Sequence, residues 1–268
     1  MTTLYTESYI NGVLTLAHTL RAVNTTSRFI LLYIPGRLSP SALCRLSSVG
    51  WELRQVPRIE PPDNGRGVFH RFLDQYTKLH IWGLDSIGIK SAVYLDGDTI
   101  ALRNFDELWD LPFNFAAVPD MYGDKRGFTL SFNAGVLFLR PSTDTLNDML
   151  LKIGTADYSH KDAEQGFLNH YFGQQVVRLP YVYNGNLAIK RLNPSFWEGM
   201  RKELRIVHYT LVKPFPELPS EIPSERELKQ LATLEEKKKE DDGFWADEIR
   251  WWEDAWTSLT LEQRQFVC

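Results

Sequence analysis

Short apolar runs alternate with amphipathic segments along the first half of the chain. Residues 2–5, 29–34 and 51–57 have the composition expected of short strands. Between the first two runs, apolar side chains recur at helical spacing, at Val13, Leu14, Ala17 and Leu20. A second helix is predicted for residues 39–49. This β-α-β order predicts an α/β fold whose central sheet is mainly parallel and covered by helices.

The second half of the chain continues the same alternation. Further strands are predicted at residues 92–95, 115–120, 133–141 and 174–180. Helices are predicted at residues 74–84 and 105–109, and residues 60–68 are expected to form a loop. We therefore expect one Rossmann-like domain over residues 1–215.

The last fifty residues have a different character. Three prolines within residues 216–225 mark a boundary, so that residues 216–268 form a separate, charged and tryptophan-rich helical tail. Within it, one helix face carries Trp245, Ile249, Trp252 and Trp256. We expect this face to pack on the catalytic domain. A partner-binding helix is the alternative, and membrane insertion is disfavoured because the segment is acidic.

Composition and cysteine usage limit the class of protein. With 268 residues, of which 43% are hydrophobic, the chain is long enough to bury a core. Cys44 and Cys268 suggest neither a disulfide framework nor a metal-binding cysteine spacing, which favours a reducing compartment. The first twenty residues lack the basic and apolar regions of a secretory signal. These features predict a cytoplasmic protein.

Charge is unevenly distributed. Residues 217–268 carry 14 acidic and 7 basic side chains, so the rest of the chain has a net charge of +3 although the whole has −4. A mildly basic catalytic part suits a small anionic ligand. No dense Lys/Arg stripe with interleaved aromatic residues occurs, so nucleic acid is not an expected partner.

The stretch YLDGDT at residues 94–99 is the strongest sign of chemistry. A buried strand ends there in Asp96, Gly97 and Asp98, and loops at the carboxyl ends of strands are where open α/β sheets bind ligands. Asp96 could be the nucleophile of an aspartyl-phosphate phosphohydrolase, or the two carboxylates could hold a metal ion. A solvated turn is the third interpretation.

Later segments favour the metal interpretation. A phosphohydrolase needs a lysine and a second acidic cluster at later strand ends, whereas the doublet Asp241-Asp242 lies in helix-like or turn-like sequence. His208 ends the β-like run RIVH, and Lys213 follows within the same short loop. Mn²⁺ accepts mixed carboxylate and imidazole ligands more readily than Mg²⁺, although Mg²⁺ is also possible. His208 is thus a candidate third ligand.

Several ordered segments together resemble the family 8 retaining glycosyltransferases, which include glycogenin and galactinol synthase. The segments are TLYTESYINGVLTLAHTLR, TKLHIWGL, YLDGDTIALRNFDELW, FNAGVLFLRPS, DAEQGFLNHYF, LPYVYN and IVHYTLVKP. The resemblance covers most of residues 1–215. It implies a single nucleotide-sugar-binding domain of the GT-A type, a UDP-sugar donor, a divalent cation and an acceptor that is a small molecule or a glycan.

The resemblance also implies roles for individual residues. The nucleotide would be lined by Leu4, Thr6 and Tyr9. The metal ligands would be Asp96 and Asp98 of the Asp-Gly-Asp motif, together with His208. Donor contacts would come from Lys78, Gly97 and, at the diphosphate, Lys213. The transferred sugar would face Asn133, Glu164 and Gln165, with Asp162 as a neighbour.

Two departures from the family pattern affect these expectations. The chain has Glu164-Gln165 where relatives commonly have Asp-Gln, and Leu211-Val212 before Lys213 where they have a glycine and one more residue. The self-glucosylating tyrosine of glycogenin has no counterpart in NLAIKRLNPSF, which disfavours glycogen priming.

We interpret the chain as a metal-dependent retaining hexosyltransferase that uses UDP-glucose or UDP-galactose. Glu164 or Asp162 is expected to steady an oxocarbenium-like state rather than to form a covalent intermediate. A homodimer is possible. An aspartyl-phosphate phosphohydrolase and a catalytically silent nucleotide-sugar-binding protein are the alternatives.

Overall fold

A parallel half-sheet is formed by the N-terminal part of the chain. The computed structural model describes residues 1–121, 128–215, 236 and 238–263. Strands β1 (Thr2–Leu4), β2 (Ile30–Tyr33) and β3 (Glu52–Gln55) pair in parallel in that order. The main chain continues this half-sheet to β4 (Ala92–Leu95), because the amide of Leu95 donates to the carbonyl of Met1 at 2.9 Å.

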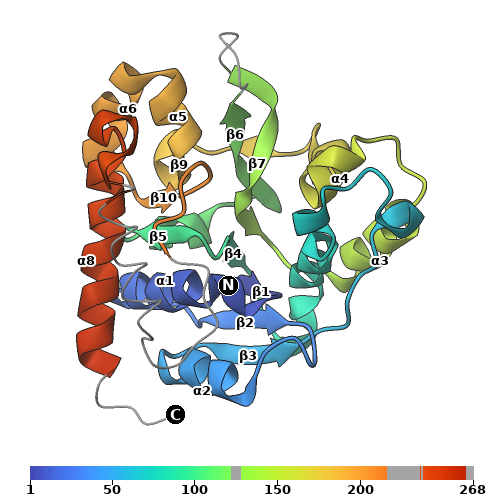
Figure 1. Ribbon diagram of the computed structural model, residues 1–268. Coiled ribbons are helices and arrows are strands. Elements are labelled where there is room, and N and C mark those ends of the chain that lie inside the picture. Colours follow the sequence, from blue (N-terminus) through green and yellow to red (C-terminus); the bar gives the residue numbers. More distant parts are fainter. Residues whose placement is uncertain (122–127, 216–235, 237, 264–268) are drawn as a thin grey trace.

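The other half of the sheet is mixed. Strand β7 (Phe128–Leu139) runs antiparallel to both β4 and β6 (Phe115–Met121), and β8 (Val177–Arg178) is parallel to β6. A small separate sheet pairs β10 (Ile206–His208) with β5 (Thr99–Ala101) and β9 (Gly185–Asn186). The predicted α/β class is confirmed, with antiparallel pairing at β7 added to the parallel strands (Figure 1).

Helices surround these sheets (Figure 1). The α-helices are α1 (Ile10–Ala22), α2 (Pro40–Ser48), α3 (Thr143–Lys152), α4 (Ala163–Phe172), α5 (Leu187–Leu192), α6 (Pro194–Met200) and α8 (Ala246–Gln263). Side chains at helix starts explain two of the boundaries. Ser39 accepts a hydrogen bond from the amide of Ala42 at 3.2 Å, and Ser142 does the same for Thr145.

Several segments that were predicted to be helices or loops contain 3₁₀ helix. The 3₁₀ helices are Glu7–Tyr9, Pro62–Gly65, His70–Phe72, Gln75–Ile87, Asp106–Asp110, His160–Asp162, Tyr181–Tyr183, Arg201–Glu203 and Glu240–Gly243. The helix predicted for residues 74–84 is thus a run of 3₁₀ turns, and the predicted loop at residues 60–68 contains one such turn.

The tryptophan face of α8 packs on the rest of the chain. Trp245, Ile249 and Trp252 are buried in a cluster that includes Phe215. This confirms the predicted packing of that face. The proline-rich boundary at residues 216–225 lies outside the described residues.

Among the described residues, no helix combines the length and apolar character needed to cross a membrane.

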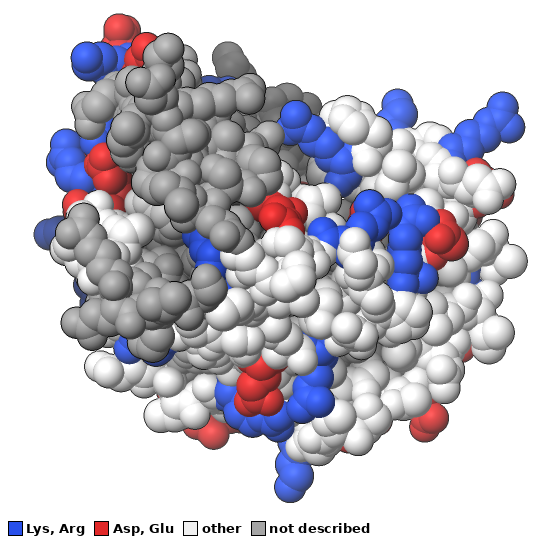
Figure 2. Space-filling view, turned by 60° about the horizontal axis from the view of Figure 1, so that its bottom comes forward, with Lys and Arg blue, Asp and Glu red and all other residues white. Residues whose placement is uncertain are grey.

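On the face seen in Figure 2, basic and acidic side chains are interspersed. The described residues there form no continuous basic stripe.

Candidate functional site

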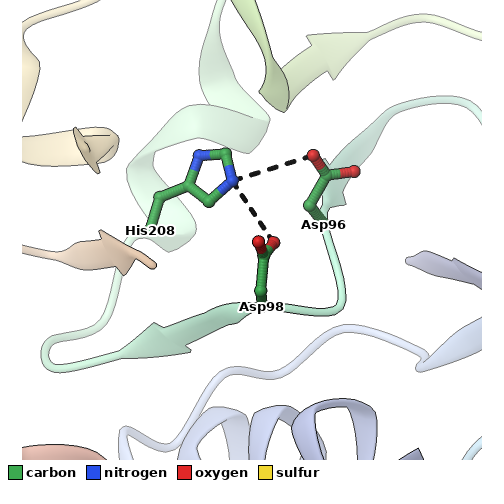
Figure 3. A group of neighbouring side chains, drawn as sticks. All are labelled: Asp96, Asp98 and His208. Carbon is green, nitrogen blue, oxygen red and sulfur yellow. Dashed lines mark ion pairs between the residues drawn. The ribbon is translucent and has the colours of Figure 1, made fainter. Parts of the chain in front are cut away.

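Strand pairing brings together three potential metal ligands. Asp96 and Asp98 occupy the turn between β4 and β5, and His208 ends β10, which pairs with β5 so that His208 lies opposite Thr99. Nε2 of His208 is 3.3 Å from Oδ1 of Asp98 and 3.8 Å from Oδ2 of Asp96 (Figure 3). One ligand atom from each residue lies within 4.8 Å of the others. Residues that are far apart in the sequence are thus adjacent in space.

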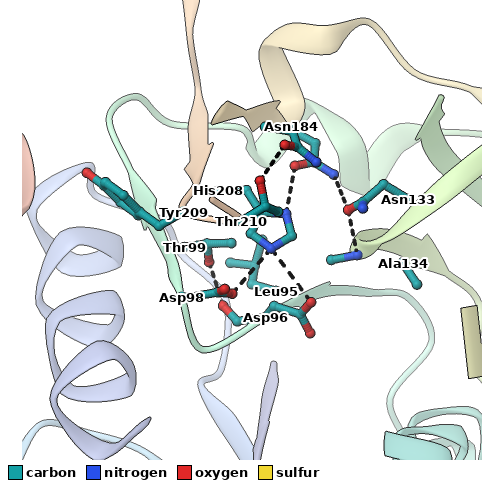
Figure 4. A network of polar contacts seen from close by, with 12 residues as sticks. Leu95, Asp96, Asp98, Thr99, Asn133, Ala134, Asn184, His208, Tyr209 and Thr210 are labelled. Atoms are coloured by element: carbon teal, nitrogen blue, oxygen red, sulfur yellow. Dashed lines mark hydrogen bonds and ion pairs between the residues drawn. The ribbon is translucent and has the colours of Figure 1, made fainter. Parts of the chain in front are cut away.

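The orientation of the His208 ring suits a cation. Its Nδ1 lies 3.2 Å from Oδ1 of Asn184, whose amide nitrogen donates to Oδ1 of Asn133 at 2.9 Å (Figure 4). An amide oxygen only accepts, so Nδ1 carries the proton of this hydrogen bond and the lone pair of Nε2 points toward the two carboxylates. Two carboxylates and one neutral imidazole nitrogen form a donor set that fits Mn²⁺.

Lys213 adds positive charge beside the same carboxylates. Its Nζ contacts Oδ2 of Asp98 and donates to the carbonyl of Tyr209 at 2.6 Å. Burial alone would raise the pKa of the Asp98 carboxyl, but the ammonium group of Lys213 holds that pKa well below its usual range. Asp98 is therefore an anion at neutral pH.

Lys78 links the metal ligands to the sugar-side residues. It is 1% exposed, and its Nζ lies 2.7 Å from Oε1 of Glu164, 3.1 Å from Oδ1 of Asp96 and 3.3 Å from the carbonyl of Ala134. Burial lowers the pKa of Lys78, and the two carboxylates more than offset this, so that the pKa lies above its ordinary value. The ammonium group holds both carboxylates in place. Its contact with a donor stays a prediction.

The predicted sugar-side residues lie at the start of α4 and in β7. Oε1 of Gln165 accepts from the amide of Ala134 at 2.9 Å and from the side chain of Asn133 at 3.3 Å. Glu164 is 5% exposed, so it is not on a solvated helix face. Asp162 is exposed at the end of the preceding turn.

The side-chain amide of Asn133 is hydrogen-bonded to other groups of the protein. Its oxygen accepts from the amide of Gly135 at 3.0 Å as well as from Asn184.

The residues predicted to line the nucleotide lie between the end of β1 and the start of α1. Leu4 is buried at the end of β1, Thr6 is exposed, and Tyr9 is half-buried with its ring 5.3 Å from that of Phe215. Close packing fixes the neighbouring backbone, because a Cβ atom on Gly12 of α1 would lie 2.3 Å from the carbonyl oxygen of Gly97.

Three further residues belong to this site although the sequence interpretation missed them. Oδ2 of Asp120 accepts from Gln165 at 2.9 Å, and burial raises the pKa of its carboxyl. Tyr94 donates to Oδ1 of Asp96 at 2.7 Å, and Asn184 orients His208. Two of these residues could have been found from the sequence, because Asp120 is the last residue of the strand-like run FAAVPD and Asn184 is the last residue of LPYVYN.

Comparison with known proteins gives a consistent result. The sequence model described as glycosyl transferase family 8 matches residues 1–215. Glycogenin of Neurospora crassa is 31% identical, with 77% of this chain and 29% of that protein covered. UDP-glucuronate:xylan alpha-glucuronosyltransferase 2 of Arabidopsis thaliana is 29% identical, with coverages of 78% and 34%. Galactinol synthase 3 of the same plant is 29% identical, with coverages of 76% and 68%. The chain spans only about a third of the first two relatives.

Solved structures support the fold. The galactosyltransferase LgtC, solved with donor and acceptor sugar analogs, has a TM-score of 0.60 at 16% identity over 98% of this chain and 99% of that chain. The bifunctional glycosyltransferase WbbM, in its apo form, has a TM-score of 0.60 at 19% identity over 80% of this chain and 46% of that chain. Both are glycosyltransferases of the fold that the sequence predicted.

Proposed function

The chain belongs to glycosyl transferase family 8, and from this premise we propose that it is a metal-dependent hexosyltransferase that uses a UDP-sugar and retains the anomeric configuration. The acceptor is a small molecule or a glycan. The observation that carries the proposal is the convergence of Asp96, Asp98 and His208, whose ligand atoms lie within 4.8 Å of one another.

These three residues would hold the cation, with Mn²⁺ favoured over Mg²⁺ by the imidazole ligand. A divalent cation there supplies positive charge to the diphosphate oxygens as the glycosidic bond breaks. Lys213 offers a second positive charge on the same side, because its ammonium group contacts Asp98. Tyr94 and Lys78 keep the Asp96 carboxylate directed into the site.

On the sugar side, Glu164 is proposed to stabilise an oxocarbenium-like state. Its Oε1 accepts from the buried ammonium group of Lys78 at 2.7 Å, which weakens this oxygen as a nucleophile and supports an electrostatic role rather than a covalent one. Gln165 and Asn133 would orient the hexose hydroxyls. Asp162 is the alternative carboxylate, because it is exposed directly before α4.

The charges near the proposed sugar position favour a neutral hexose. Asp120 and Glu164 both contribute carboxylates there, and Gln165 bridges from Asp120 to the backbone of Ala134. A glucuronate carboxylate would be repelled by these groups. We therefore favour UDP-glucose or UDP-galactose, although two relatives are named for UDP-glucuronate.

The nucleotide is proposed to lie at the start of α1. Thr6 offers an exposed hydroxyl and Tyr9 a half-buried ring, while Leu4 contributes through its main chain because its side chain is buried. Gly97 is proposed to contact the donor through its main chain, because a Cβ atom there would lie 2.9 Å from the side chain of Val13.

Turnover of purified protein tests this function. UDP release should be measured with UDP-glucose, UDP-galactose and UDP-glucuronate, each with Mn²⁺ and each with a chelator. We expect metal-dependent release, faster with a neutral hexose, and slow hydrolysis when no acceptor is present. Hydrolysis of p-nitrophenyl phosphate without UDP release would favour the phosphohydrolase. UDP binding without release from any of these donors would indicate a silent binding protein.

A further inference from the structure

A buried ion pair joins α8 to the helices that follow β9. The carboxylate of Glu248 on α8 is 0% exposed. Its Oε2 lies 2.7 Å from Nζ of Lys190 on α5, and its Oε1 accepts from the indole of Trp197 on α6 at 3.0 Å. Both carboxylate oxygens thus have partners, and the position of this turn of α8 is fixed against α5 and α6.

The same turn of α8 holds the side chain of Tyr209. The hydroxyl of Tyr209 donates to the main-chain carbonyl of Glu248 at 2.6 Å, and the tyrosine is fully buried. Tyr209 directly follows His208 at the end of β10. Since neighbouring side chains of an extended chain point in opposite directions, His208 faces the carboxylates while the ring of Tyr209 is directed away from them (Figure 4).

The main chain of Tyr209 contacts two groups of the candidate site. Its amide donates to the carbonyl of Asp98 at 2.9 Å, and its own carbonyl accepts from Nζ of Lys213 at 2.6 Å. A displacement of Tyr209 would therefore move the acceptor that positions the Lys213 ammonium group. It would also loosen the pairing that sets His208 against Asp98.

The loop after Tyr209 rests on α8 as well. Val212 and Phe215 are buried in the same cluster as Trp245 and Trp252 of the tail. Lys213 lies between these two apolar contacts. The loop carrying the proposed diphosphate lysine is thus anchored at Tyr209 and again at Val212 and Phe215.

We propose that Tyr209 is a positioning residue of the metal and diphosphate site, and that α8 sets its position through the carbonyl of Glu248. The inference rests on the proposed function, because it assigns to the tail a role in the geometry of that site. It predicts that the affinity for metal depends on a hydrogen bond whose donor and acceptor are not metal ligands.

Tyr209→Phe tests this with little change in packing, because it removes the hydroxyl and keeps the ring. We expect the affinity for Mn²⁺, titrated alone and followed by electron paramagnetic resonance, to fall by at least about threefold, as for groups that support metal ligands. The melting temperature should fall by no more than about 4 °C. Leu259→Ala is the control, because Leu259 lies on the same helix but is buried in a different core cluster. It should lower the melting temperature more and leave the affinity for Mn²⁺ unchanged.

Two results would overturn the inference. One is a Tyr209→Phe protein that binds Mn²⁺ as the parent does. The other is a loss of affinity in both variants that follows their loss of stability, because general loosening would then explain it. Glu248→Gln provides a second variant: it weakens the pair with Lys190 and should reduce Mn²⁺ affinity in the same direction as Tyr209→Phe. Failure of the parent itself to bind Mn²⁺ would instead overturn the proposed function, together with the inference that depends on it.

Discussion

Nε2 of His208 lies 3.3 Å from Oδ1 of Asp98, although Asp98 precedes β5 and His208 ends β10, far apart in the sequence. The antiparallel pairing of β10 with β5 creates this relationship, and the hydrogen bond from Nδ1 to Asn184 orients the ring. If this imidazole is a metal ligand, its removal has a direct consequence.

His208→Ala should lower the affinity for Mn²⁺ by at least about tenfold, because one of three protein ligands is lost. His70→Ala is a suitable control, since His70 is exposed in a separate 3₁₀ turn. The measurement is a titration with Mn²⁺ alone. Equal affinities of the parent and His208→Ala proteins would exclude the ligand role.

Glu164→Gln should slow UDP release at saturating donor by about a hundredfold, because an amide cannot supply the charge that stabilises a developing oxocarbenium ion. Donor binding should change less than the rate, since that charge appears mainly in the transition state. A rate within about twofold of the parent would contradict the role that we assign to Glu164. Asp162→Asn would then be the next variant to measure.

Lys78→Met should destabilise the fold by about 3–5 kcal/mol, because it leaves the buried carboxylate of Glu164 without its partner. Adding Glu164→Gln to Lys78→Met should recover part of this loss, since the uncompensated charge is then removed. Urea denaturation of the parent, both single variants and the double variant measures the coupling. Strictly additive changes would mean that the pair at 2.7 Å contributes no interaction energy.

Gly12→Ala should disturb the metal turn. The new Cβ would lie 2.3 Å from the carbonyl oxygen of Gly97 and 2.9 Å from the ring of Phe215, so the backbone between Asp96 and Asp98 must shift. We expect a loss of about 1–3 kcal/mol in the free energy of unfolding and weaker binding of Mn²⁺. Gly154→Ala is the matched control, because a Cβ there has open space. Indistinguishable Mn²⁺ affinities for the two variants would argue against this packing constraint.

Trp252→Ala should lower the free energy of unfolding of the isolated protein by about 3–5 kcal/mol, because this ring is buried in the core cluster shared with Phe215. Trp251→Ala, at a half-buried position on the same helix, should cost less. Thermal denaturation of both variants distinguishes the interpretations. If α8 were primarily a partner-binding helix, Trp252→Ala would leave the melting temperature nearly unchanged and would alter only assembly.

Several of these features could be predicted from local sequence. The Asp-Gly-Asp turn follows an apolar strand, so it was recognised as a place where ligands bind. His208, which ends another β-like run, was a candidate third ligand. The tryptophan stripe of α8 was visible because helical periodicity is a local property. The pairing of β5 with β10 was not predictable, because each strand has only three residues and their contact is non-local.

The residues that were missed acquire their roles only in the folded chain. Glu248 lies in an acidic tail and resembles a solvated helix residue, yet Lys190 and Trp197 make its burial possible. Asn184 resembles an ordinary loop residue until its side chain is seen to orient His208. In both cases the role of a polar side chain depends on hydrogen-bond partners that lie far away in the sequence.

The central claim is that Asp96, Asp98 and His208 hold a cation that binds the diphosphate of a UDP-sugar. Calorimetric titration with UDP, in Mn²⁺ and again in a chelator, tests it without knowledge of the sugar or the acceptor. We expect UDP to bind the parent at least about tenfold more tightly with Mn²⁺, and Asp98→Asn to lose most of that difference while keeping its fold. UDP affinity that is the same with and without Mn²⁺, or an Asp98→Asn protein that responds to Mn²⁺ as the parent does, would contradict the claim.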